Sequence, residues 1–155
     1  MSIEKVREYL SKFGVQDRIL EFSVSSATVE LAAKALRCEP CQIAKSMAFQ
    51  MGAGAILIVA AGDVKIDNSK FKAEFATKAK MVQFDEVEKV IGHAAGGVCP
   101  FAINKNVKVY LDESLKRFEK VYPACGSSNS AIGLSIPELE KFSSFEKWVD
   151  VCKFI

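Results

Sequence analysis

The sequence predicts an α+β domain in which helices flank a mixed, largely antiparallel β-sheet. Segments with helical apolar spacing interleave with short apolar runs that are typical of strands. Several strand-like runs are joined by connections too short for a crossover helix, which favours this sheet over a doubly wound one. The chain has 155 residues, of which 50% are hydrophobic and 26% charged. This is the size and balance of one globular domain, so we expect residues 1–155 to form a single unit.

The first part of the chain is predicted to hold two helices around a short strand. Residues 3–13 carry apolar side chains at helical spacing, and a glycine follows as a stop. Residues 19–22 have the composition of a short strand. A second helix is expected to end near Leu36, with Ser25 or Ser26 as its cap.

The middle of the chain is predicted to form a hairpin followed by two helices. Residues 44–50 and 55–61 are apolar runs of strand length, and the few residues between them include two glycines. Helices are expected at residues 70–76 and 85–91. Asp85 is the predicted cap of the second one, which ends at a glycine.

The last third is predicted to be mostly strands. Apolar and β-branched runs indicate strands at residues 101–103, 107–111, 121–122 and 131–136. Pro137 suits a first helical position, so a short helix is expected to begin there.

The charge balance excludes a protein that binds nucleic acid over a broad basic surface. The chain has 21 basic and 19 acidic side chains, a net charge of +2, whereas binding through phosphates usually needs a strong basic excess. Positive charge exceeds negative clearly only in one helical stretch, which includes Lys65, Lys70, Lys72, Lys78 and Lys80. We therefore expect no DNA partner, and any RNA to be held locally. A solvated helix face is the alternative interpretation of these lysines.

Cysteine usage and the apolar runs favour a reduced, cytoplasmic location. The five cysteines have no regular spacing, and the chain starts with a charged amphipathic segment rather than an apolar signal core. The most apolar run, residues 53–62, is far shorter than the roughly 20 residues of a spanning helix. We therefore expect no association with a membrane.

Lys45 is the most unusual residue of the predicted hairpin. Strand side chains alternate between faces, so Lys45 should share its face with the apolar Met47 and Phe49. A lysine in such a row needs a partner for its charge or a cleft for its head group. The pattern leaves two interpretations open, a functional cation and a strand-end lysine that extends into water.

Two loops could bind a ligand. Residues 92–101 contain adjacent glycines, whose amides could face a carbonyl or an oxyanion, although such a pair is also common in plain turns. Residues 124–129 are small and polar, and they form either a turn or a pocket wall.

Other chemistries are weakly supported. His93 is the only histidine and only Cys38 and Cys41 form a close pair, so we expect neither a metal site nor a cofactor. That pair leaves a thiol redox protein as an alternative, although it follows a helix instead of beginning one. A nucleophilic Cys99 or Cys125 with His93 as its base is not favoured by the spacing.

Taken together, the sequence resembles the YbaK/EbsC family, the aminoacyl-tRNA deacylases related to the editing domain of bacterial prolyl-tRNA synthetase. The segments that carry the resemblance occur in the same order, at residues 42–46, 62–67, 92–101, 110–114 and 125–135. The resemblance implies hydrolysis of the ester that joins a wrongly attached amino acid to the 3′ end of tRNA. It implies a mischarged tRNA as partner, with a tRNA synthetase as a second candidate partner.

The resemblance also implies roles for particular residues. Lys45 falls on the family's functional lysine. The family's substrate loop, with the pattern Gly-x-x-x-Pro, falls on Gly96, Gly97, Val98, Cys99 and Pro100. The pocket for the amino acid would be shaped by Gly126, Ser127 and Asn129.

Two departures prevent the transfer of a family member's specificity. Cys99 stands where the family often has serine or threonine, and Ala102 where glycine is frequent. Alanine, cysteine, serine and threonine all remain candidate amino acids, since small pockets discriminate poorly by size. A nucleophilic role for Cys99 is a hypothesis that Cys99→Ser tests. A binding module that has the same fold but no turnover is the main alternative to a deacylase.

Overall fold

A six-stranded mixed sheet forms the centre of this computed structural model, which describes residues 2–155. Its strands, in spatial order, are β8 (Leu134–Ser135), β6 (Lys120–Pro123), β2 (Ile43–Met51), β3 (Gly54–Ala61), β5 (Lys108–Asp112) and β9 (Lys147–Val149). The pairs β2–β3 and β6–β8 are antiparallel, whereas β2–β6, β3–β5 and β5–β9 are parallel. The prediction of an α+β fold with a mixed sheet is therefore confirmed. The parallel share of the central sheet is larger than expected because residues 62–107, between β3 and β5, are long enough for a crossover.

Two small antiparallel ribbons accompany this sheet. One pairs β1 (Leu20–Glu21) with β7 (Ser130–Ala131), and the other pairs β4 (Val64–Ile66) with β10 (Cys152–Phe154). Each ribbon joins distant parts of the chain, since β1 and β4 meet strands from its last third. The β1–β7 ribbon ties residues 20–26 to the polar loop near residue 128, because Phe22 and Ser26 donate their N–H groups to the carbonyls of Asn129 and Ser128.

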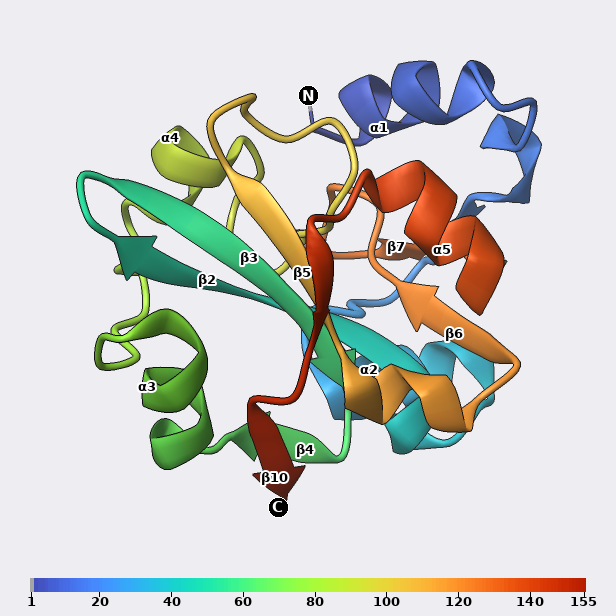
Figure 1. Cartoon of the computed structure of the whole chain (residues 1–155). Coiled ribbons are helices and arrows are strands. Elements are labelled where there is room, and N and C mark those ends of the chain that lie inside the picture. The colour runs from blue at the N-terminus through green and yellow to red at the C-terminus, as the bar shows by residue number, and fades with distance from the viewer. Residues whose placement is uncertain (1) are drawn as a thin grey trace.

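Within residues 2–155, five α-helices cover the sheet (Figure 1). They are α1 (Ser2–Ser11), α2 (Val29–Leu36), α3 (Asn68–Phe75), α4 (Val87–Ile91) and α5 (Ile136–Ser143). Buried side chains of α1, α4 and α5 share one hydrophobic core with one face of β3. Phe71 of α3 packs into a second core on the opposite face, together with β4 and β10. Helix α2 packs Ala32 and Ala33 against Ile43, at the start of β2.

Most predicted elements are present, but two predicted caps are wrong. Thr28 caps α2, because its hydroxyl accepts from the N–H of Leu31. Ser26 instead donates its N–H to the Ser128 carbonyl at 2.6 Å. Asp85 does not cap α4, which is preceded by Glu86 without a side-chain hydrogen bond. Helix α5 begins as predicted, with Pro137 in its first turn and a capping box at its start.

The predicted strand at residues 101–103 is also wrong. Ala102 has a φ of +55°, a left-handed conformation that interrupts extended backbone. The predicted strand at residues 131–136 is divided into the short β7 and β8, and β9 and β10 were not predicted at all. Among residues 2–155, no helix is both long enough and apolar enough to span a membrane.

Candidate functional site

A cavity of about 440 Å³ opens along one edge of β2. Its walls come from four segments: the start of α2, strand β2, residues 81–87, and the loop that contains Gly96 and Val98. Strands β6 and β7, with Ala124 between them, close its remaining side. The walls are mostly small and apolar, and Lys45 is the charged side chain among the described lining residues.

This edge of β2 is open because its two neighbours leave a gap. In an antiparallel pair, the N–H and C=O of every second residue point away from the partner strand. Ala48 of β2 is such a residue, because its carbonyl accepts from the N–H of Val82, at 3.0 Å, and not from β3. At the other end, β6 pairs with β2 only at residues 43–44. The pairing of β6 with β2 stops at Pro123. Ala131, the bridge partner of Ala124, lies at the opposite edge of β6, in register with β8.

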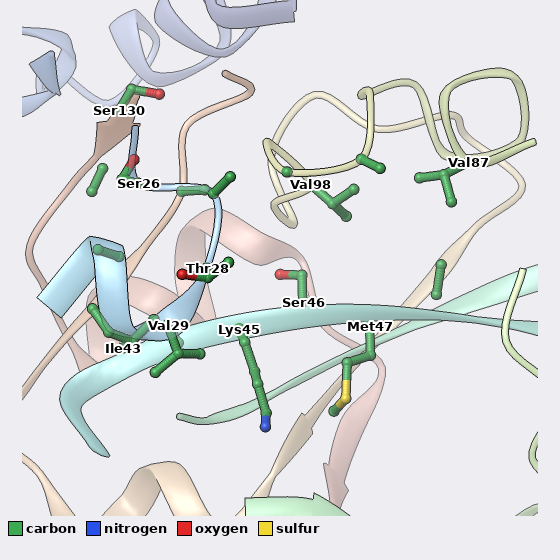
Figure 2. A pocket seen from close by; sticks show the side chains of 18 of the residues that line it. Ser26, Thr28, Val29, Ile43, Lys45, Ser46, Met47, Val87, Val98 and Ser130 are labelled. Atoms are coloured by element: carbon green, nitrogen blue, oxygen red, sulfur yellow. The ribbon is translucent and has the colours of Figure 1, made fainter. Parts of the chain in front are cut away.

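Ser46 lies in the middle of this gap. By the alternation along β2, its N–H and C=O point to the open edge, and neither has a partner within residues 2–155. Its hydroxyl oxygen is buried and also has no hydrogen-bond partner there. In Figure 2 the Ser46 side chain points toward the side of the cavity where Thr28 and Val98 lie. Unpaired buried polar groups are uncommon in native proteins, so this cluster is a candidate binding position for a water molecule or a ligand.

Lys45 projects from the opposite face of β2, on the same side as Met47 (Figure 2). It thus lies beside an apolar row, as the alternation predicts. Its ammonium donates to the carbonyl of Val64 in β4. Burial lowers the pKa of Lys45, and the nearby Cys152 and Asp63 partly offset this effect. Lys45 forms no ion pair with a carboxylate among the described residues.

The loop of residues 96–100 contributes two of its five predicted site residues to the cavity wall, Gly96 and Val98. Gly97, Cys99 and Pro100 lie behind that wall and are buried. The N–H of Gly97 donates to the Ala94 carbonyl at 3.0 Å, so it is not free for a ligand. A Cβ at Gly97 would lie 2.7 Å from backbone atoms of Gly126 and Ser127. Glycine is therefore needed here for close packing of two loops.

The predicted pocket residues Gly126, Ser127 and Asn129 lie next to the cavity without lining it. They hold neighbouring segments in place. The side-chain amide of Asn129 donates to the Phe22 carbonyl at 2.9 Å, and the hydroxyl of Ser127 lies 2.6 Å from that of Ser130, a lining residue. Together with the hydrogen bond from the Ser26 N–H to the Ser128 carbonyl, this network ties the segment that precedes α2 to the loop.

Cys99 and His93 form a closed pair outside the cavity. Cys99 Sγ lies 3.5 Å from His93 Nε2, which lies 2.6 Å from the Phe101 carbonyl. Both side chains are fully buried. Burial raises the pKa of Cys99 to about 12 and lowers the pKa of His93. The thiol is therefore protonated and enclosed, which does not fit a nucleophile. Cys125 is likewise buried, and burial raises its pKa.

Cys38 and Cys41 do not have the environment of a redox pair. Cys38 follows the C-terminal end of α2, and burial raises its pKa. Redox-active pairs need the opposite shift, which a helix N-terminus provides. Within residues 2–155, no three side chains of the metal-ligating types His, Cys, Asp and Glu come together.

Ser46 and Phe84 were not singled out from the sequence. Phe84 lines the cavity yet is 82% exposed, and Met81 beside it is 58% exposed. The only sequence signal for Ser46 is its position next to Lys45, which alternation places on the other face.

Comparisons with known proteins agree with this arrangement. The family model described as "Aminoacyl-tRNA editing domain" matches residues 24–142. The chain is 49% identical to the "Uncharacterized protein YwhH" of Bacillus subtilis (strain 168), over 99% of this chain and 98% of that one.

Two solved structures share its fold and 27% of its sequence, each with a TM-score of 0.87. One is described as a "putative trans-editing enzyme for prolyl tRNA synthetase". The match covers 98% of this chain and 97% of that structure's chain. The other comes from work on scaffold proteins that present linear epitopes. The match covers 99% of this chain and 98% of that structure's chain. The chain belongs to the family of aminoacyl-tRNA editing domains.

Proposed function

We propose that this protein is a trans-acting deacylase, which hydrolyses the ester between a small amino acid and the 3′ end of a mischarged tRNA. The observation that carries the proposal is the cavity at the open edge of β2, in a chain of the editing family. Residues 1–155 would act as one editing domain. The setting is translation quality control in the cytoplasm, and a tRNA synthetase is a candidate partner.

The cavity suits hydrolysis without a protein nucleophile. An aminoacyl ester is activated, so positioning and stabilisation of the oxyanion can supply much of the rate. The hydroxyls in the wall, those of Ser26, Thr28, Ser46 and Ser130, have no histidine or carboxylate beside them among the lining residues. Hydrogen-bond donors are available at the edge of β2, at the first turn of α2 and at the N–H of Val98. A water or a hydroxyl of the ribose would attack the ester.

Lys45 is proposed to hold the terminal nucleotide of the tRNA. Its ammonium lies on the face of β2 opposite to the Ser46 hydroxyl, so contact with a phosphate fits better than contact with the ester carbonyl. The neighbouring carboxylate of Asp63 is held by Arg117 at 2.6 Å. The charge of Lys45 is therefore available to an anion. Lysines 78 and 80, which are exposed near the cavity wall formed by Met81, would add weak contacts with RNA.

The size and chemistry of the walls favour a small, uncharged amino acid. Ala27, Ala95 and Gly96 form one side, with Ala124 and Ala131 on another. No lining carboxylate is available to pair with a basic side chain. Alanine, cysteine, serine and threonine are the candidates. Gly97, Cys99, Pro100, Gly126, Ser127 and Asn129 would act indirectly, by fixing the two loops behind the wall.

The test is deacylation by the wild type and by Lys45→Ala over aminoacyl-tRNAs in which amino acid and tRNA vary separately. We expect ester loss above the uncatalysed rate for at least one small amino acid. Lys45→Ala should lower kcat/KM at least 10-fold, whereas Lys153→Ala, an exposed lysine in β10, should not. Binding of charged tRNA without faster ester loss would support the binding module instead. Full activity of Lys45→Ala would remove Lys45 from the mechanism.

A further inference from the structure

The gap in the edge of β2 has the geometry of one missing residue. Its two limits are Pro123, the last residue of β6 that pairs with β2, and Val82, whose N–H donates to the Ala48 carbonyl. Between them, the N–H and C=O of Ser46 both face the cavity and lack partners within residues 2–155. In an antiparallel ladder, such a residue exchanges two hydrogen bonds with one residue opposite to it.

An aminoacyl ester can take the place of that opposite residue. Its carbonyl oxygen and its α-nitrogen are separated by the same two carbon atoms that separate the C=O and N–H groups of a residue in a strand. We propose that Ser46 binds the aminoacyl group as a strand of one residue. The N–H of Ser46 donates to the ester carbonyl, and the C=O of Ser46 accepts from the α-ammonium. This inference rests on the proposed deacylase function.

The Ser46 hydroxyl completes this subsite. Its oxygen is buried without a partner and points to the side of the cavity where Thr28 and Val98 lie (Figure 2). There it can hold the attacking water. The water oxygen bonds to the carbonyl carbon, the bond from that carbon to the ribose oxygen breaks, and the ribose oxygen takes up the proton that the water loses. The Ser46 N–H stabilises the carbonyl oxygen while it carries negative charge.

This arrangement divides recognition into two parts. The edge of β2 binds the α-ammonium and the carbonyl, two groups that every aminoacyl ester has. Sheet edges bind the backbone of peptides by the same kind of hydrogen bonds. The small and apolar walls read the side chain. The protein should therefore discriminate strongly against esters that lack the α-amino group, whatever their side chain.

The direct test uses wild-type protein and pairs of esters on the same tRNA. Each pair differs only in the α-amino group: alanyl and propionyl, seryl and 3-hydroxypropionyl, cysteinyl and 3-mercaptopropionyl. For the amino acid that is hydrolysed, we divide kcat/KM by the uncatalysed hydrolysis rate of the same ester, because the α-ammonium also activates the ester. We expect this ratio to fall roughly 10- to 100-fold without the amino group, the range of a hydrogen bond to a charged group. A fall of less than 3-fold would overturn the inference. Hydrolysis of no aminoacyl ester at all would instead contradict the proposed function.

A second test compares Ser46→Ala with Ser46→Pro. Both remove the hydroxyl, but only proline also removes the N–H. Proline is tolerated at an edge position whose N–H makes no ladder bond, and Lys45 before it is already extended. We expect Ser46→Pro to be at least 10-fold less active than Ser46→Ala, at a similar thermal unfolding temperature. Equal activity of two folded variants would contradict the role of the N–H. If Ser46→Pro does not fold, the pairs of esters decide.

Discussion

The contact between Gly97 and the loop at Gly126 gives a prediction with a calculable size. In Gly97→Ala, the new Cβ would lie 2.7 Å from Gly126 C and from Ser127 N, and 2.8 Å from Ser127 Cα. Contacts of 3.4 Å or more are ordinary, so the two loops must separate by about 0.7 Å. Neither neighbour is a flexible side chain. Overpacking of this kind costs about 1–3 kcal/mol.

The assay measures thermal unfolding and deacylation. For a domain of this size, 1 kcal/mol corresponds to about 2–4 °C, so Gly97→Ala should lower Tm by roughly 2–12 °C. The shift also moves Gly96 and Val98 in the cavity wall, so kcat/KM should fall about 10- to 100-fold. Gly54→Ala is the control, because its Cβ would meet no atom closer than 3.9 Å. Unchanged stability and activity in Gly97→Ala would refute the packing of this loop against Ser127.

Three further predictions concern titratable groups. Burial lowers the pKa of Lys45, so activity that needs its positive charge should decline at a lower pH than it would with an ordinary lysine. We expect kcat/KM of Lys45→Arg to decline at a higher pH than that of the wild type, which pH profiles of the two proteins measure. Because Cys99 is buried and its thiol is protonated, Cys99→Ser should keep kcat/KM within about 3-fold of the wild type, and Cys99 in the native protein should resist alkylation. A roughly 100-fold loss of activity in Cys99→Ser would restore the nucleophile hypothesis. The hydrogen bond from Arg18 lowers the pKa of Glu138 to about 2. The pair therefore stabilises the folded state fully at pH values above the ordinary pKa of a glutamate. This stabilisation is lost as the pH falls through about 2. Because the pair is partly exposed, Glu138→Gln should lower the free energy of unfolding in urea by only ~1 kcal/mol at pH 7 and by almost nothing at pH 2. An equal decrease at both pH values would contradict this prediction.

The sequence predicted the elements that depend on local pattern. The β2–β3 hairpin follows from two apolar runs of strand length, and the start of α5 follows from Pro137. The faces of β2 follow from alternation, which correctly placed Lys45 beside an apolar row. The strand at residues 101–103 failed because Ala102 adopts a positive φ that composition does not reveal.

The site was predictable only in part. Gly96 and Val98 line the cavity, but Gly126 and its neighbours support the wall from behind. Ser46 could not be recognised from its type. Its N–H and C=O lack partners within the described residues because the pairing of β6 with β2 ends at Pro123, and the place where it ends depends on the fold of the last third of the chain.

The most direct test of the proposed function is the rate of ester loss from a set of aminoacyl-tRNAs under single-turnover conditions. We predict that this protein accelerates the loss of alanine, cysteine, serine or threonine from at least one tRNA, and that Lys45→Ala abolishes most of that acceleration. Rates equal to the uncatalysed hydrolysis for every aminoacyl-tRNA would contradict the assignment of this cavity as a deacylase site.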